Sequence, residues 1–220
     1  MNFSDKVEKK TEYLRNAILR HPFTIGIGDG TLDIEKFKFY VCQDYLYLID
    51  YSKVLALASA RSNNLGNMSW FARLLNETLN TEMELHREYC AKFGISRNKL
   101  EQTKLSPTTL AYTQYLLNIA RHNQYSELVA ALLPCQWGYW EIGNHLRKNK
   151  SIGINPLYDQ WIDMYASNEF KTLADWIRKL ADDLAKDLTT QDLIAMQQTY
   201  ITSLRYEYLF WESCYNFETW

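Results

Sequence analysis

The sequence contains few residues that break helices and no segment typical of a membrane span or a nucleic-acid surface. Only 8 glycines and 4 prolines occur among its 220 residues, about half the share found in average proteins. No apolar run approaches the ~20 residues that cross a bilayer. The formal net charge is -2, and no cluster of Lys or Arg covers a segment, which argues against nucleic acid or an anionic membrane as the main partner. These absences favour a protein built from long helices.

Signals for export and for disulfides are also missing. The first residues, Met1 to Asp5, are polar and lead directly into a charged helical segment, so we expect no signal peptide. The cysteines are widely spaced and form no CxxC pair, which argues against a disulfide framework. We therefore predict a cytoplasmic protein with reduced thiols at its four cysteine positions, Cys42, Cys90, Cys135 and Cys214.

Hydrophobic periodicity predicts seven or eight helices joined by short connections. No repeat, low-complexity tract or linker interrupts the chain, so we predict one all-α domain over residues 1–220, a single-domain helical bundle. The predicted helices cover about 4–20, 34–60, 67–93, 107 onward, 125–148, 156 onward, 169–188 and 190 to beyond 211.

Capping residues support several of these boundaries. Asp33 and Ser106 precede helical segments as N-caps, and Thr189 begins a sequence that resembles a capping box. Gly94 follows the third segment, as expected of a C-cap. The glycine-rich segment 26–30 is predicted to be a loop, and it resembles a phosphate-binding loop only superficially because no strand precedes it.

Four predicted helices place a polar or reactive side chain on an otherwise apolar stripe. One such group could be a structural hydrogen bond, but burying a carboxylate without partners costs several kcal/mol. Four on separate helices suggest a shared internal pocket, the usual ligand site of a helical bundle. The groups are Asp44, Glu82 with His86, Cys135 with Tyr139, and Glu207.

The segment 132–141, Leu-Leu-Pro-Cys-Gln-Trp-Gly-Tyr-Trp-Glu, is the most informative of these. Pro134 lies inside a long helical pattern, where proline removes an N–H and kinks the helix. Cys135 follows directly, and Tyr139 lies one turn further on the same face. A thiol at such a kink is well placed to meet a ligand.

Each group also has a purely structural interpretation. A buried cysteine is usually a small hydrophobic residue, and we expect this of Cys42, Cys90 and Cys214. Asp44 and Glu207, each taken alone, could be core carboxylates bonded to a neighbouring hydroxyl. Glu82 and His86 favour a structural pair over a catalytic one, by about two to one. The case for a site depends on these groups occurring together.

Three segments together resemble the TenA family, the thiaminase II or aminopyrimidine aminohydrolase group, in its cysteine-containing branch. They are 43–47 (Gln-Asp-Tyr-Leu-Tyr), 132–141 and 206–211 (Tyr-Glu-Tyr-Leu-Phe-Trp). The resemblance implies an all-helical fold similar to haem oxygenase and a homotetramer. It also implies hydrolysis of 4-amino-5-aminomethyl-2-methylpyrimidine to the hydroxymethyl pyrimidine and ammonia, in thiamine salvage. Cleavage of thiamine to pyrimidine and thiazole alcohols is implied as well.

The same resemblance implies roles for individual residues and no cofactor or metal. Cys135 would be the nucleophile and Glu207 the acid, while Asp44, Tyr139 and Tyr165 would bind the pyrimidine. Cysteine addition to the ring paired with proton donation is a form of covalent catalysis. Further pocket residues are expected at Tyr47, Tyr112 and Phe210.

Some features leave other functions open. Trp137 and Trp140 near the cysteine could narrow the pocket or only pack. A metal oxygenase of the di-iron type is conceivable because Glu82 with His86, and Glu141 with His145, have i,i+4 spacing. The Glu-x-x-His pairs of di-iron bundles are absent, however. A binding module that uses the same pocket without chemistry is a third alternative.

Overall fold

The structure, a computed structural model, describes residues 1–149 and 155–220, and none of these forms a strand. The prediction of an all-helical protein is confirmed. The helices are α1 (Phe3–Lys10), α2 (Glu12–Leu19), α3 (Pro22–Asp29), α4 (Ile34–Ala60), α5 (Leu65–Glu77), the π-helix η1 (Thr78–Glu82), α6 (Met83–Lys92), α7 (Arg97–Glu101), α8 (Pro107–His122), α9 (Tyr125–Asn149), α10 (Pro156–Tyr165), α11 (Asn168–Leu184), the 3₁₀ turn η2 (Ala185–Asp187) and α12 (Thr190–Tyr215).

Side-chain caps set the predicted beginnings of three long helices. The Asp33 carboxylate accepts from the Glu35 N–H at 2.9 Å where α4 begins. Ser106 Oγ accepts from the Thr109 N–H at 3.2 Å before α8. Thr189 Oγ1 accepts from the Asp192 N–H at 3.2 Å before α12. Each cap satisfies one of the N–H groups that a helix leaves unbonded at its first turn.

Two predictions for the N-terminal part were wrong. The expected helix 4–20 is divided at Thr11 into α1 and α2, and the Thr11 hydroxyl bonds to the Val7 carbonyl at 2.7 Å. The expected glycine loop is mostly helical, since residues 26–29 belong to α3. A Cβ added at Gly28 would come within 2.8 Å of the Leu146 side chain, so close packing explains this glycine. Among the glycines of this segment, Gly30 alone has the left-handed backbone of a helix end, with φ of 77°.

The predicted helix 67–93 contains one turn of π-helix, and this turn changes which face is buried. Thr78 and Met83, five residues apart, are both buried, whereas an α-helix repeats its face every three or four residues. Leu79, inside this turn, is 43% exposed and Glu82 is half-buried, whereas His86 on α6 is buried, as its place on the apolar stripe predicted.

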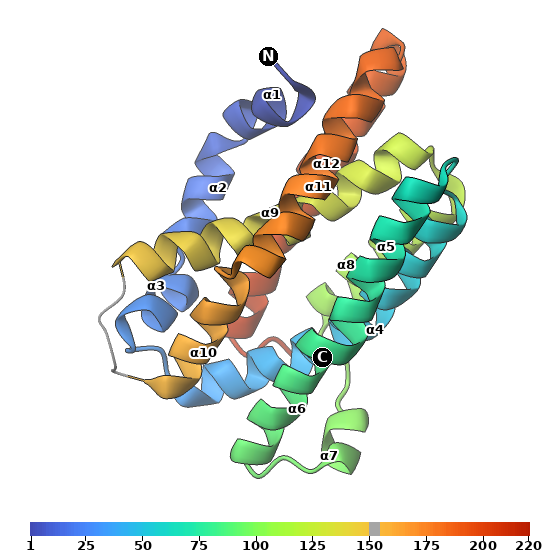
Figure 1. Cartoon of the computed structure of the whole chain (residues 1–220). Helices are drawn as coiled ribbons and strands as arrows, with labels where there is room; N and C mark the ends of the chain where they lie inside the picture. Colours follow the sequence, from blue (N-terminus) through green and yellow to red (C-terminus); the bar gives the residue numbers. More distant parts are fainter. Residues whose placement is uncertain (150–154) are drawn as a thin grey trace. The chain divides into compact units, whose positions relative to one another are not determined.

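The chain forms two compact units. The first comprises Met1–Leu32 and Ser126–Trp211, and the second comprises Asp33–Tyr125 and Glu212–Trp220. In the first, α1 packs against α2 and α11, and α10 packs against α3 and α11. In the second, α4 packs against α5, α6 and α8, and α5 and α8 can be followed beside α4 in Figure 1. A single domain over 1–220 stays a prediction.

The predicted buried stripes of the remaining long helices are confirmed. In α4, Phe37, Tyr40 and Val41 are fully buried, and Asp44 between them and Leu48 is 2% exposed. The stripes of α9 and α12 are buried as well, with Leu128, Leu132, Ile142 and Leu146 on α9 and Tyr200, Leu204 and Trp211 on α12. Of the polar groups singled out by the sequence, Asp44, His86, Cys135, Tyr139 and Glu207 are buried, whereas Glu82 is half-buried.

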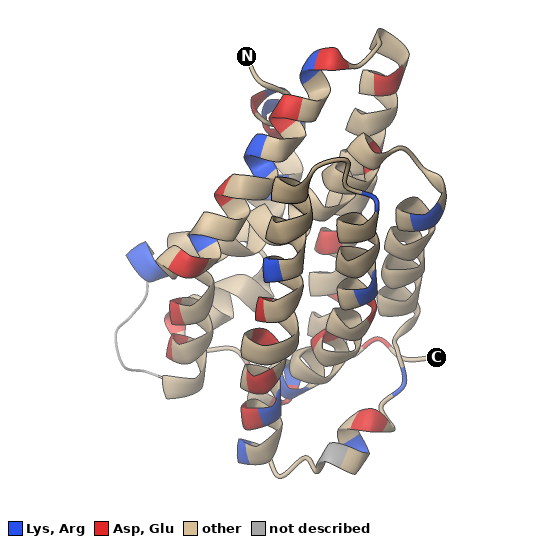
Figure 2. Ribbon diagram, turned by 45° about the vertical axis from the view of Figure 1, so that its right-hand side comes forward, with Lys and Arg blue, Asp and Glu red and all other residues tan. Residues whose placement is uncertain are grey.

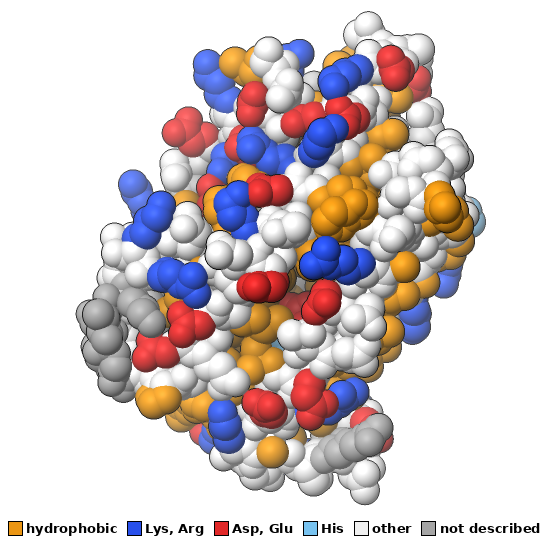
Figure 3. Space-filling model, in the orientation of Figure 1, with side chains coloured by type: hydrophobic (Ala, Val, Ile, Leu, Met, Phe, Trp, Pro, Cys, Tyr) orange, Lys and Arg blue, Asp and Glu red, His pale blue; other side chains and the backbone are white. Residues whose placement is uncertain are grey.

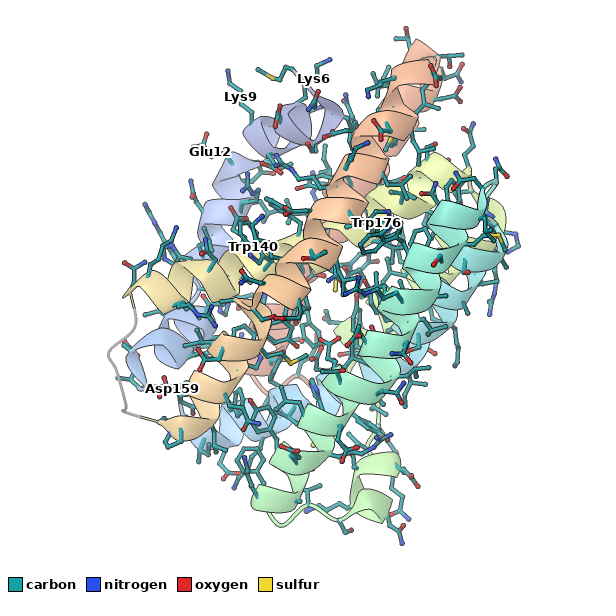
Figure 4. All side chains as sticks on the ribbon, viewed as in Figure 1. Lys6, Lys9, Glu12, Trp140, Asp159 and Trp176 are labelled. Carbon is teal, nitrogen blue, oxygen red and sulfur yellow. The ribbon has the colours of Figure 1, made fainter. Side chains whose placement is uncertain are left out.

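Charged residues of both signs are distributed over the helices (Figure 2). On the face drawn in Figure 3, Lys and Arg lie among Asp and Glu, and neither sign forms a large patch of its own. Lys6, Lys9 and Glu12 project away from α1 and α2 (Figure 4), and all three are exposed. In the described part of the chain, no helix is both long and apolar enough to cross a membrane.

Candidate functional site

All eight residues predicted for the site are buried, and each lies in a helix. Those in the second unit are Asp44 and Tyr47 on α4 and Tyr112 on α8. Those in the first unit are Cys135, Tyr139, Tyr165, Glu207 and Phe210, on α9, α10 and α12. Their exposed fractions run from 0% for Tyr165 to 9% for Cys135.

Asp44 is the centre of a buried hydrogen-bond network. Its Oδ2 accepts from the Tyr40 hydroxyl at 3.1 Å, one helical turn earlier on α4. The same oxygen lies 2.8 Å from His86 Nε2 on α6. The His86 and Asp44 side chains are only 1% and 3% exposed, so this pair is shielded from water.

The second nitrogen of His86 fixes the protonation of the ring. Nδ1 lies 2.8 Å from the Glu82 carbonyl oxygen, which can only accept, so Nδ1 carries a proton. Nε2 faces the Asp44 carboxyl group, and a ring that donates from both nitrogens is an imidazolium. Burial lowers the pKa of His86, but the hydrogen bond and charge of Asp44 and the Glu82 contacts outweigh it, and the pKa is raised. Asp44 and His86 thus form a buried ion pair.

Three aromatic rings of the second unit pack against one another. Tyr47 stacks on Tyr51 with ring centroids 5.6 Å apart and planes 19° apart. Tyr47 also contacts Tyr112 of α8 at 5.2 Å. Flat aromatic surfaces suit a planar ligand. Two of the predicted binding residues, Tyr47 and Tyr112, are therefore in direct contact.

The proline beside Cys135 lies within α9, which continues through it to Asn149. Pro134 has no N–H to donate and disturbs the hydrogen bonds of the preceding turn. There the Ala131 carbonyl accepts from the Ser203 hydroxyl of α12 at 2.6 Å. This bond joins α9 to α12 close to Cys135, so the helix that carries the thiol is held by the helix that carries Glu207.

Tyr139 lies in an aromatic cluster of the first unit. Its ring centroid is 4.9 Å from that of Tyr165, the last residue of α10. It is also 5.4 Å from Trp211, and Trp211 contacts Phe210 at 6.2 Å. Three of the predicted binding residues, Tyr139, Tyr165 and Phe210, therefore belong to one cluster of rings.

Glu207 borders a small cavity of about 20 Å³ in the first unit, which is room for about one water molecule. Pro134, Gly138 and Trp211 are among the residues that line it. The Glu207 side chain is 4% exposed and follows Leu204 on the buried stripe of α12. A carboxylate in this position is screened from bulk solvent, as general acids commonly are.

The two tryptophans near Cys135 pack against each other and against basic residues of α11. The ring centroids of Trp137 and Trp140 are 4.6 Å apart. The Arg178 guanidinium lies 4.4 Å from the Trp137 ring, and Lys171 Nζ lies 5.3 Å from the Trp140 ring. These are cation–π contacts, so packing accounts for both residues; Trp140 is labelled on α9 in Figure 4.

Sequence reasoning treated His86 as a structural partner of Glu82 and missed its bond to Asp44. The available signal was a histidine on the apolar side of its helix, but its partner lies on a different helix. The glutamate–histidine pairs considered for a metal have protein partners: His86 bonds to Asp44, and Glu141 is paired with Arg15. Across residues 1–149 and 155–220, no group of three or more His, Cys, Asp or Glu side chains is arranged to hold a metal.

Comparisons with known proteins point to one family. Residues 8–216 match the model of the TENA/THI-4/PQQC family. The chain is similar to an aminopyrimidine aminohydrolase of Halalkalibacterium halodurans, with 44% identity over 100% of this chain and 98% of that protein. It is also 34% identical to the aminopyrimidine aminohydrolase of Bacillus subtilis, over 100% of this chain and 92% of the relative.

Solved structures agree. A TenA family transcription regulator from Silicibacter sp. TM1040 is similar with a TM-score of 0.90 and 30% identity, over 97% of this chain and 96% of that one. A domain with a haem oxygenase-like fold from Shewanella denitrificans has a TM-score of 0.75 at 16% identity, over 96% and 91% of the two chains. The haem-oxygenase-like architecture expected from the sequence is therefore confirmed. With its match over nearly the whole length, this chain belongs to the TENA/THI-4/PQQC family.

Proposed function

We propose that this protein is an aminopyrimidine aminohydrolase of thiamine salvage. It converts 4-amino-5-aminomethyl-2-methylpyrimidine and water to 4-amino-5-hydroxymethyl-2-methylpyrimidine and ammonia. The observation that carries the proposal is the 44% identity, over the full chain, to a relative named for this activity. Cys135 and Glu207, buried on neighbouring hydrogen-bonded helices, supply a nucleophile and an acid for it.

Covalent catalysis by Cys135 accounts for the reaction. Its thiolate adds to carbon 6 of the pyrimidine while Glu207 gives a proton to the adjacent ring nitrogen. The ring loses its aromaticity, and its electrons expel the protonated amine from the exocyclic methylene as ammonia. Water adds to that methylene and releases a proton to solvent, the ring nitrogen returns its proton to Glu207, and departure of the thiolate restores the ring.

The remaining residues bind and orient the pyrimidine. The Asp44 carboxylate accepts a hydrogen bond from the exocyclic amine, and the His86 imidazolium holds that carboxylate in one orientation. Tyr139 and Tyr165 bind the pyrimidine from the first unit, and Tyr47, Tyr112 and Phe210 add further aromatic surface. Stacking a base on an aromatic ring contributes about 1–3 kcal/mol in nucleic-acid systems.

The same addition chemistry would cleave thiamine, whose thiazolium replaces ammonia as the leaving group. Thiamine hydrolysis to the pyrimidine and thiazole alcohols is therefore the second activity that we propose. We also propose a homotetramer, which the family resemblance implies, and a cytoplasmic location, which the polar N-terminus and the spacing of the cysteines predict. Light scattering from the purified protein tests the tetramer.

The test of the activity is product formation. Purified protein is incubated with the aminomethyl pyrimidine and, separately, with thiamine, and hydroxymethyl pyrimidine and ammonia are quantified. We expect catalytic turnover of the aminomethyl pyrimidine with equal amounts of the two products. Tight binding of the pyrimidine without any release of ammonia would favour a binding module and refute the proposal.

A further inference from the structure

Two of the four cysteines form a pair that the proposed reaction does not use. Cys42 lies on α4 and Cys90 on α6, two helices that pack against each other in the second unit. None of the four cysteines forms a disulfide. Contacts on either side bring Cys42 opposite Cys90: His86 lies 2.8 Å from Asp44, and the rings of Phe37 and Phe93 are 6.2 Å apart. Cys42 is half-buried, whereas Cys90 is only 2% exposed. The expectation that both are inert core residues does not account for this arrangement.

Cys42 opens onto a cavity of about 650 Å³ whose lining residues all belong to the second unit. Lys38, Lys99 and Lys104 are also in the lining, and the last two of these are exposed. A small solute from water can therefore reach one thiol of the pair. The other thiol lies behind it, in the core.

The surroundings make the two thiols chemically unequal. The hydrogen bond from Cys90 lowers the pKa of Cys42; burial opposes this, while the positive charges of Lys99 and His86 lower it further. The hydrogen bond to Cys42 and burial raise the pKa of Cys90 well above its ordinary value. The thiolate is the nucleophilic form of cysteine, so the accessible member of the pair is the reactive one.

We propose that Cys42 and Cys90 are an oxidative modification site, at which a small hydroperoxide converts the two thiols to a disulfide that links α4 to α6. The Cys42 sulfur attacks the outer oxygen of the O–O bond, which yields a sulfenic acid and water or an alcohol. Cys90 sulfur then attacks the Cys42 sulfur, and the S–O bond breaks with release of water. The two thiols lose two electrons and two protons in total, and the hydroperoxide is the oxidant.

The link would form beside the Asp44–His86 pair. Cys42 is two residues before Asp44 on α4, and Cys90 is one helical turn after His86 on α6. The proposal does not depend on the proposed hydrolase activity, because its readout is the chemical state of the thiols. Cys214 provides an internal comparison: it is fully buried, and burial and the Asp44 charge raise its pKa.

Peptide mapping tests the site. The reduced full-length protein is treated with a small molar excess of hydrogen peroxide, free thiols are alkylated under denaturing conditions, and peptides are identified by mass. We expect a linked pair of peptides that contain Cys42 and Cys90 and have lost two hydrogen atoms, restored by dithiothreitol. Cys214 should be recovered alkylated.

Single variants separate the roles of the two thiols: attack on the peroxide by Cys42 and formation of the disulfide by Cys90. In Cys90→Ser, dimedone should capture Cys42 as the sulfenic acid. In Cys42→Ser, oxidation of Cys90 should be at least ~10-fold slower than in the parent. The matched control Cys214→Ser should form the link at the parent rate. Two outcomes would overturn the proposal. In one, Cys42 and Cys90 are both recovered alkylated although Cys135 has been oxidised. In the other, Cys42 becomes a sulfinic acid while Cys90 stays unmodified.

Discussion

The two buried acids proposed for the site have different surroundings. Asp44, on α4, bonds to a tyrosine hydroxyl and to the His86 ring. Glu207, on α12, follows Leu204 along an apolar stripe and borders a small cavity that Arg15 and Trp211 also line. An acid that must bind a ligand as an anion benefits from a hydrogen-bonded cation, whereas an acid that must deliver a proton benefits from exclusion of bulk water. The paired environment of Asp44 supports a binding role, and the enclosed position of Glu207 is compatible with the proposed proton transfer.

The largest loss of activity is expected at Cys135, because no other side chain is proposed to act as the nucleophile. In Cys135→Ser the hydroxyl is a far weaker nucleophile than a thiolate, so kcat should fall by about 10³-fold or more. Steady-state kinetics and circular dichroism check activity and fold together. A near-normal rate in the folded variant would remove Cys135 as the nucleophile.

The ion pair around Asp44 predicts a stability effect. In His86→Gln the Asp44 carboxylate loses its cation, and breaking a buried pair costs about 3–5 kcal/mol of unfolding free energy. Because the pKa of His86 is raised on folding, the pair's contribution is complete below the ordinary value of 6.5 and is lost as pH rises through the raised pKa.

Chemical denaturation of wild type and His86→Gln between acidic and alkaline pH measures this difference. We expect the advantage of the wild type to decrease as the pH rises. Arg87→Gln, which removes a cation one residue away on the exposed side of α6, should leave the pH dependence unchanged. An advantage that grows with pH would mean that the Asp44–His86 contact is not an ion pair in solution.

Substitution of Glu207, the acid on α12, is expected to lower the rate far more than the affinity. Glu207→Gln keeps the shape of the side chain but cannot donate the proton, so kcat should fall by about 10²-fold or more, while affinity for hydroxymethyl pyrimidine changes far less. Kinetics and calorimetric titration provide the two values. Equal losses in rate and affinity would assign Glu207 to binding alone.

The smallest effect concerns the aromatic cluster. Tyr139→Phe keeps the ring and removes one hydroxyl, so KM should rise about tenfold, the equivalent of one hydrogen bond to the substrate. Tyr13, which is 65% exposed on α2, provides the matched control Tyr13→Phe, for which KM should not change. If both variants keep the wild-type KM, the Tyr139 hydroxyl does not contact the substrate.

A comparison of α4 with η1 and α6, which pack on it, shows how much of the fold the sequence could predict. The bounds of α4 follow from local information, namely the Asp33 cap and a regular apolar stripe. The π-turn Thr78–Glu82 has no such local signature, and the bond between His86 and Asp44 joins two helices, which no pattern within one helix predicts. The sequence therefore identified Asp44 and its buried position, but not its partner.

The same limit applies to the glycines of α3 and to the paired thiols. Gly26 and Gly28 are typical of a loop, but both lie in α3, where their close packing against Leu32 and Leu146 explains the absence of a side chain. Cys42 and Cys90 are far apart in sequence, and only the packing of α4 on α6 brings them together. Composition and periodicity predict which side chains are buried, but they do not predict which buried side chains meet.

The covalent step at Cys135 is the central claim, and a mass measurement during turnover tests it most directly. Wild-type protein and Cys135→Ser are mixed with the aminomethyl pyrimidine, quenched with acid within one turnover, and analysed as intact protein and as peptides. We predict a transient pyrimidine adduct on the peptide that contains Cys135, and none in the variant. Full hydrolytic activity in Cys135→Ser, or an adduct on another cysteine, would contradict the account.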